Sequence, residues 1–201
     1  MTFDDVVRNG FASDTAPCLL FPARRGALDH DAALPLSAIT EFHPIVHCLS
    51  RDPQRFATLA GRLALATLEG SRTPLGKRVQ RLWKVLEKYF PELPRLADAS
   101  ALKLSFETSS RAAVPLSALS DGERAILLLC GEIAVRSPDD GVILVDEIEQ
   151  HLHPKWQRAI LEAIVALVPT AQLIVTTQSP YVAACAPDDV VEVGDWRAHG
   201  E

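Results

Sequence analysis

Apolar residues in the last third of the chain fall into two patterns. Val142-Ile143-Leu144-Val145 and Leu173-Ile174-Val175 are short unbroken runs of branched side chains, as in strands that are buried on both faces of a parallel sheet. Between these runs, behind Pro154, apolar residues recur at helical spacing, namely at Trp156, Ile160, Leu161, Ile164, Leu167 and Val168. A strand, a helix and a second strand in this order predict a βαβ unit.

The same patterns divide the rest of the chain. Residues 18 to 21 predict one short strand in an otherwise irregular segment, residues 52 to 68 and 75 to 90 predict two helices, and residues 102 to 107 alternate like an exposed strand. The apolar residues 125 to 130 predict the buried part of a helix that begins near Glu123. We therefore expect an N-terminal segment 1–50, a helical insertion 51–98, an α/β part 99–193 and a loose tail 194–201.

Two adjacent carboxylates follow the first apolar run. Asp146 and Glu147 stand at the carboxyl end of the predicted strand, where open α/β sheets bind ligands, and adjacent residues of an extended chain point to opposite sides. A carboxylate beside a dry strand is costly unless a cation or a donor offsets its charge, and Mg²⁺ with nucleotide phosphates would do so. Gln178, just after the second run, is expected to face the same crevice. The alternative is a strand that ends in two solvated acids.

Further segments accompany these carboxylates in a fixed order. They are Leu119-Ser120-Asp121-Gly122-Glu123-Arg124 before the first run, Glu149-x-x-Leu152-His153-Pro154 after it, and Thr176-Thr177-Gln178-Ser179-Pro180 after the second run. With Asp146 and Glu147 they resemble the C-terminal half of an ABC-type ATPase head of the RecF/SMC/OLD-like branch, over roughly residues 114 to 193. The resemblance implies an α/β, P-loop NTPase-like fold, with a mostly parallel sheet flanked by helices and an inserted helical segment.

By this resemblance, Ser120, Asp121, Gly122 and Glu123 form the signature loop, which reaches across a dimer to the γ-phosphate of ATP that the partner binds. A serine hydroxyl, a glycine that permits close approach and the N-terminus of a helix together suit an anion. Ser120 followed by Glu123 is also an ordinary capping box, and both interpretations can hold at once.

The resemblance also assigns the remaining site residues. Asp146 matches the Walker B aspartate that holds Mg²⁺, and Glu147 matches the catalytic glutamate that orients or deprotonates the attacking water. The segment 149–153, with His153, matches the D-loop, which crosses the dimer interface. Gln178 stands where many relatives carry a switch histidine that senses the γ-phosphate. Glutamine donates and accepts hydrogen bonds but takes up no proton, so we expect phosphate contact without proton transfer.

A phosphate-binding loop of the form G-x-x-x-x-G-K-[ST] is the missing part. The nearest approach, Gly70-Ser71-Arg72-Thr73-Pro74-Leu75-Gly76-Lys77-Arg78, is one residue too long, has Arg78 in place of the hydroxyl and follows no buried strand. We expect this segment to be unrelated to phosphate binding. The loop is then missing because the chain is truncated, because a second chain supplies it, or because the protein is a degenerate relative, and the intact Asp146 and Glu147 favour the first two.

Composition sets limits on these interpretations. The 201 residues are 48% hydrophobic, enough to bury a core, and no apolar run approaches the length of a membrane span. A net charge of −6 argues against a chain that coats nucleic acid unaided. Six basic residues nevertheless crowd into residues 72 to 88, either on the exposed face of a helix or as a DNA contact, namely Arg72, Lys77, Arg78, Arg81, Lys84 and Lys88. Scattered cysteines without a C-x-x-C pair predict reduced, mostly buried thiols in a cytosolic protein.

The expected function is ATP binding and hydrolysis with Mg²⁺. ATP would close a homodimer or heterodimer into a sandwich and so gate a partner activity, with DNA or a nuclease-like effector as partner in DNA repair or in defence against foreign DNA. The alternative is a regulatory or dimerisation module that keeps the signature surface and never turns over ATP. A metal site built on His151 and His153 is disfavoured because H-x-H among scattered acids matches no metal-ligand spacing.

Overall fold

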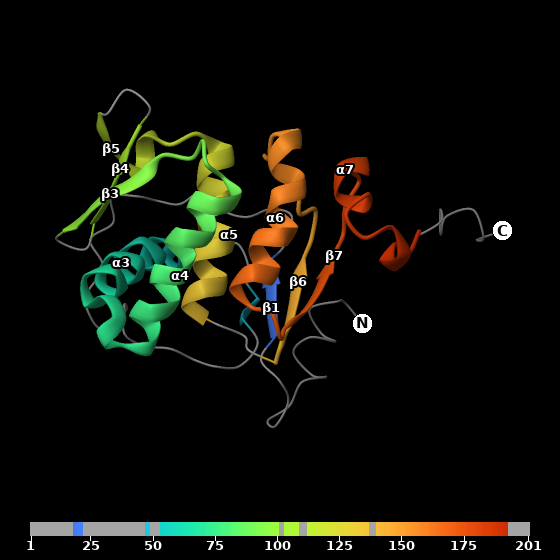
Figure 1. Cartoon of the computed structure of the whole chain (residues 1–201), viewed down its shortest axis with the longest axis horizontal. Helices are drawn as coiled ribbons and strands as arrows, with labels where there is room; N and C mark the ends of the chain where they lie inside the picture. Colours follow the sequence, from blue (N-terminus) through green and yellow to red (C-terminus); the bar gives the residue numbers. More distant parts are fainter. Residues whose placement is uncertain are drawn as a thin grey trace.

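A computed structural model describes residues 18–21, 47–48, 53–100, 103–108, 112–136 and 140–192. These residues form a four-stranded sheet, a three-stranded sheet and the helices that pack with them (Figure 1). The expected tail from residue 194, and the expected N-terminal segment apart from residues 18–21 and 47–48, lie outside the described residues. None of the helices in the described ranges has the length and apolar character needed to span a bilayer.

The larger sheet is parallel throughout. Its strands β1 (Cys18–Phe21), β2 (His47–Cys48), β6 (Val142–Val145) and β7 (Gln172–Val175) lie in the order β2-β1-β6-β7. Helix α6 (Pro154–Leu167) connects β6 to its neighbour β7. The predicted βαβ unit, and with it the α/β class of the fold, is therefore confirmed.

Only one face of this sheet is well buried among the described residues. Ile143 and Val145 are buried, whereas Ile174, which points from β7 to the opposite face, is 48% exposed. The prediction that both apolar runs are buried on both faces is therefore wrong for β7. The cause is that α4, α5 and α6 pack against one another in a single group beside the sheet (Figure 1).

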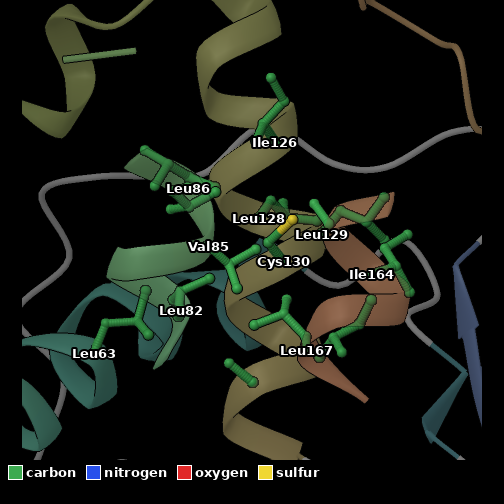
Figure 2. Packing of buried hydrophobic residues seen from close by; sticks show 14 of the residues in the cluster. Leu63, Leu82, Val85, Leu86, Ile126, Leu128, Leu129, Cys130, Ile164 and Leu167 are labelled. Carbon is green, nitrogen blue, oxygen red and sulfur yellow. The ribbon is translucent and has the colours of Figure 1, made fainter. Parts of the chain in front are cut away.

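Helix α5 (Asp121–Arg136) is the centre of this group. Every residue from Ile126 to Val135 is buried, because α3 (Pro53–Glu69), α4 (Pro74–Tyr89) and α6 all contact it. Figure 2 shows the apolar side chains that meet around α5, among them Leu82, Val85, Leu86, Leu128, Leu129, Cys130, Ile164 and Leu167. The predicted helices are thus confirmed, with bounds that shift by one or two residues.

The turn between α3 and α4 explains the glycines that mimic a phosphate loop. Gly70 has a φ of +57°, and a Cβ on Gly76 would lie 1.8 Å from the carbonyl oxygen of Gly70. Thr73 caps α4 by accepting a hydrogen bond from the Gly76 N–H at 3.0 Å. Both glycines therefore serve a tight turn between helices, and the expectation that this segment does not bind phosphate stays a prediction.

The smaller sheet was mostly missed by the sequence patterns. Strands β3 (Arg95–Ser100), β4 (Lys103–Glu107) and β5 (Ala113–Pro115) pair antiparallel in the order β3-β4-β5. Only β4 was predicted. Its alternation is confirmed, but the strand is not exposed as expected, because Leu104 and Phe106 are buried. Strand β3 runs across the expected boundary between residues 98 and 99, and the division of the chain into an insertion and an ATPase part stays a prediction.

A cluster of buried and half-buried charged residues joins α5 to α3 and α4. Glu132 is 1% exposed and its Oε2 accepts a hydrogen bond from Nε of Arg136 at 2.5 Å. Burial raises the pKa of Glu132 against the opposing effect of Arg136, and burial also lowers the pKa of Arg62, which Glu132 partly offsets. Arg78 donates to the carbonyl oxygens of residues 134 and 135, at 3.1 and 3.3 Å. Arg78 therefore packs inward, unlike the exposed position that the sequence predicted.

The two cysteines whose side chains are described differ in environment. Cys130 is buried in α5, where burial raises the pKa of its thiol to about 12, whereas Cys185 is exposed. The expectation of mostly buried thiols thus fits Cys130 and is wrong for Cys185.

We predict that Glu132→Ala lowers the free energy of unfolding by about 3–5 kcal/mol, because it leaves Arg136 and Arg62 without their buried counter-charge. Urea denaturation followed by circular dichroism measures the loss. Glu87→Ala is the matched control, since the Glu87–Arg95 pair is solvent-exposed at 57% and 68% and is worth about 1 kcal/mol or less. Equal losses in the two variants would contradict a structural role of the buried cluster.

Candidate functional site

The parallel register of β6 and β7 brings the ends of the two strands together. The Asp146 N–H donates to the carbonyl oxygen of Phe21 in β1 at 2.8 Å, and the Thr176 N–H donates to the carbonyl oxygen of Val145 at 2.9 Å. Strand-like pairing therefore continues one residue beyond each strand. The side chains that follow emerge at one edge of the sheet, as the sequence predicted for Glu147 and Gln178.

One hydroxyl links the two carboxylate residues. Thr176 Oγ1 donates to Asp146 Oδ1 at 2.5 Å and accepts the backbone N–H of Glu147 at 2.8 Å. The Thr176 carbonyl also accepts the N–H of Ile148 at 3.2 Å. Thr176 thus holds the carboxylate of Asp146 and the backbone of Glu147 to the end of β7.

The backbone at Glu147 has an unusual conformation. Its φ is +47°, and His151, four residues on, has a φ of +64°. A non-glycine residue in this left-handed region costs of order 1 kcal/mol or more and persists where surrounding contacts impose it. The turn sends the Glu147 side chain back toward β7, where Gln178 Nε2 donates to Glu147 Oε1 at 3.5 Å.

Glu149 joins the loop after β6 to the loop after β7. Its two carboxylate oxygens accept one hydrogen bond each, from Thr177 Oγ1 at 2.6 Å and from the Gln178 N–H at 2.7 Å. Thr177 Oγ1 in turn accepts the N–H of Ser179 at 3.0 Å. Glu149 therefore fixes the backbone that positions Gln178, a part that the sequence analysis did not assign to it.

The predicted signature residues form a helix cap. The Ser120 N–H donates to Glu123 Oε2 at 2.7 Å, and the Glu123 N–H donates to Ser120 Oγ at 3.4 Å. Arg124 bonds the Asp121 carboxylate and donates to the carbonyl oxygen of Ser117 at 3.2 Å. The capping box is thus present, while the Ser120 and Asp121 side chains remain exposed at the N-terminus of a 16-residue helix.

Gly122 fits the start of α5 against the loop after β6. A Cβ at this position would lie 2.8 Å from the His151 carbonyl oxygen and 3.2 Å from the Trp156 ring. Only glycine leaves room for so close a backbone approach. The segment with Ser120 therefore touches the segment that carries Glu147 to His153, although its hydrogen bonds stay within its own cap.

His153 serves the start of α6. It is exposed, and its Nδ1 accepts the N–H of Lys155 at 3.4 Å as the N-cap of the helix. Gln157, one turn into α6, donates to the Leu152 carbonyl oxygen at 2.9 Å and accepts from Ser179 Oγ at 2.6 Å. The start of α6 thereby ties the loop after β6 to the loop after β7.

The carboxylates at this edge suit a metal ion that keeps other ligands. Within the described ranges, no group of three or more His, Cys, Asp and Glu side chains is arranged to hold a metal ion. Mg²⁺ usually takes only one or two carboxylates and completes its shell with water and phosphate oxygens. Asp146, which is exposed, matches that requirement.

Two threonines and a glutamate, which the sequence placed in family segments without a role of their own, hold the site together. Thr176 and Thr177 follow β7 directly, and Glu149 lies within the turn after β6. Their one signal was position, since each is a polar residue just past the end of a strand. Which side chain would bond which could not be read from the sequence because the pairs are 28 to 30 residues apart.

Comparison with known proteins adds a family match. A family model described as "AAA domain, putative AbiEii toxin, Type IV TA system" matches residues 47–184, which is more than half of the chain.

Curated relatives match shorter stretches. The chain is 34% identical over 86 residues to a retron Vc95 probable ATPase of Vibrio cholerae, 43% over 75 residues to a retron Ec83 probable ATPase of Escherichia coli, and 43% over 56 residues to the Septu protein PtuA of Bacillus thuringiensis. These stretches cover 37%, 32% and 27% of this chain. They span only 17%, 14% and 14% of the relatives' own lengths.

Among solved structures, a chain from a study of SMC ATPases superimposes with a TM-score of 0.46 at 19% identity, over 56% of this chain and 73% of that one. An Smc head bound to the C-terminal winged-helix domain of ScpA gives the same TM-score at 18% identity, over 63% of this chain and 42% of that one.

We predict that Glu149→Ala speeds hydrogen exchange at the Gln178 amide by about tenfold or more, because the loop after β7 loses two hydrogen bonds to a charged acceptor. Exchange is measured by mass spectrometry on peptides that cover residues 176–183. Glu149→Gln keeps one acceptor oxygen, so its exchange rate at the Gln178 amide should lie between those of the unaltered chain and Glu149→Ala. Glu162→Ala, an exposed acid on α6, is the control, and a similar change in that variant would show that Glu149 does not hold the loop.

Proposed function

The chain belongs to the family described as AAA domain, putative AbiEii toxin, type IV TA system, and from this premise we propose that it supplies the Walker B and signature half of an ATPase site. Hydrolysis of Mg²⁺-ATP at that site would gate a partner activity. The observation that carries the proposal is the joined set of Asp146, Glu147 and Gln178 at the carboxyl ends of two adjacent parallel strands.

Asp146 and Glu147 divide the chemistry between them. Asp146, aligned by the Thr176 hydroxyl, holds Mg²⁺, which neutralises phosphate charge when bound. Glu147 orients the attacking water and accepts its proton. The Asp146 carboxylate is bonded by Thr176 and the Glu147 carboxylate by Gln178, so the two acids have different partners and can serve different atoms.

Gln178 contacts the terminal phosphate through its side-chain amide. It already donates to Glu147 Oε1, so it can bridge the general base and the phosphate without changing its own charge. Glu149 positions Gln178 by accepting its backbone N–H, and Thr177 in turn bonds the second oxygen of Glu149. This arrangement supports contact with the phosphate by a fixed donor in place of proton uptake.

The signature residues act across a dimer, of two copies or of two different chains. Ser120 and Asp121 are exposed at the N-terminus of a long helix, where an anion is favoured. Gly122 seats this helix against His151 of the same chain, in the segment that leads to His153. Closure on a partner's nucleotide would therefore move the signature loop and the loop after Glu147 together.

The strand that carries the phosphate-binding loop would pair with the outer edge of β7. In the order β2-β1-β6-β7, β7 has no further strand beside it among the described residues. A parallel strand paired there would end beside Glu147 and Gln178, so the loop that follows it would reach their ligand. The phosphate-binding loop then comes from outside these 201 residues or from a second chain.

The gated activity concerns DNA maintenance or defence, with a nuclease-like effector or DNA as partner. The similarity to the retron ATPases and to PtuA supports this choice.

The first test is calorimetry of Mg²⁺-ATP binding to the 201-residue chain, with Asp146→Asn as control. We expect no saturable binding below about millimolar ATP, because affinity at such sites comes largely from the backbone N–H groups of the phosphate loop. Tight binding that Asp146→Asn abolishes would mean that the chain itself contains an unrecognised phosphate loop.

The second test uses the assembly that includes the phosphate loop. Glu147→Gln should lower ATP turnover roughly a hundredfold or more, the usual share of a general base, and leave ATP binding in place. Glu162→Gln, on the exposed face of α6, should change neither. If the unaltered assembly binds ATP but never hydrolyses it, the chain is a regulatory dimerisation module, and unchanged turnover in Glu147→Gln would remove that residue from the mechanism.

A further inference from the structure

Helix α4 is strongly basic. Its residues include basic side chains at five positions and a single acid, for a net charge of +4, on a protein whose net charge is −6. Arg78 is turned inward to α5. The other four, Lys77, Arg81, Lys84 and Lys88, are exposed.

These four cations form a narrow line, which we call the α4 stripe. At 3.6 residues per turn they fall within about 60° of the helix circumference and extend over about 16 Å along its axis. The structure gives Lys77, Arg81 and Lys84 no ion pair within its described ranges, while Lys88 contacts Tyr89. The only acid of α4, Glu87, is engaged by Arg95 at 3.1 Å.

A cavity opens at the C-terminal end of the α4 stripe. Its volume is about 290 Å³, and its walls are mostly apolar, with Trp83, Leu93, Leu119 and Leu127 among them. Lys84 belongs both to the α4 stripe and to the lining of this cavity, and Arg95 lines it as well. Glu87 lines the cavity too and pairs with Arg95. The α4 stripe thus leads through Lys84 to a mostly apolar pocket with Trp83 in its wall.

We propose that this surface binds a single strand of nucleic acid, with its phosphates along the α4 stripe and one unpaired base in the cavity beside Trp83. A row of cations next to an aromatic side chain is the combination that single-strand binding requires, because the charges follow the backbone and the ring meets the face of a base. A duplex offers the phosphates but keeps its bases stacked inside, so it cannot fill the cavity.

Other occupants fit less well. A membrane surface would need large apolar side chains beside the cations, and none of the exposed large hydrophobic residues found in the described part lies on α4. An acidic protein segment would have to hold its acids in register with cations at intervals of about 6, 4.5 and 6 Å along the axis, whereas a nucleic acid strand carries one charge on every nucleotide.

The position of the cavity gives binding a consequence. Leu119, at its wall, directly precedes Ser120, and Leu127 lies in the second turn of α5. A base in the cavity therefore touches the segment that starts α5. The surface itself involves no residue of the proposed ATPase site, so the proposal can fail or hold independently of ATP hydrolysis.

The test is fluorescence anisotropy of the full 201-residue chain with a labelled 20-nucleotide oligo-dT, without ATP, over about 50 to 200 mM salt. Arg81→Gln/Lys84→Gln should weaken binding at least tenfold at the lowest salt and reduce the slope of log K against log [salt] by about 1.4, or 0.7 for each lost phosphate contact. Lys103→Gln/Arg158→Gln is the control, because it removes the same kinds of exposed charge from β4 and α6, and it should change the affinity less than twofold. Far-UV circular dichroism checks that both variants fold alike.

Two further probes of equal length test the cavity. An abasic strand has the same charge and should bind several-fold more weakly than oligo-dT, and a duplex should also bind more weakly. Oligo-rU that binds like oligo-dT supports recognition of the backbone. The proposal is overturned if the two double variants lose equal affinity, or if the duplex or the abasic strand binds as tightly as oligo-dT. It is also overturned if polyglutamate displaces oligo-dT at equal charge concentration.

Discussion

Parallel pairing of β6 with β7 is the constraint on which the candidate site depends. With Val145 opposite Val175, the next residues of both strands leave the sheet at the same level, and the Thr176 hydroxyl can reach Asp146 and the Glu147 N–H together. A slip of one residue would turn every side chain of β7 to the opposite face of the sheet. Register therefore decides whether the two carboxylates have partners at all.

The loops beyond the strands are held by side chains more than by regular structure. Glu149 bonds across to Thr177 and Gln178, and Gln157 bonds across to Ser179. The left-handed turn at Glu147, a conformation that costs a glutamate free energy, is held by the bonds of its own N–H to Thr176 and of its carboxylate to Gln178. The loops that carry the proposed chemistry are thus preorganised by neighbours that take no part in it.

Helix α5 connects this edge of the sheet to the rest of the molecule. Its N-terminus carries the exposed Ser120 and packs through Gly122 on the loop after β6, while its C-terminal half is locked by the buried Glu132 and by Arg78 of α4. The stretch from Ile126 to Val135 is buried throughout, and a close-packed segment of this kind cannot shift without its neighbours. Helix α4 also packs directly on α5, so the α4 stripe and the exposed Ser120 belong to neighbouring helices.

The sequence by itself determined the elements whose signal is local. Apolar runs predicted β6, β7 and the buried part of α5, the spacing of apolar residues predicted α6, and the order of motifs led to the family that the comparisons then showed. It missed β2, β3 and β5, because short strands with few apolar residues, such as residues 95 to 100, are stabilised mainly by pairing with a neighbour. Tertiary structure alone decided that Arg78 turns inward, that one sheet face is left open at Ile174, and that Thr176 and Glu149 hold the site. Each of these depends on contacts between segments far apart in the chain, and the spacing of residues along the sequence does not predict such contacts.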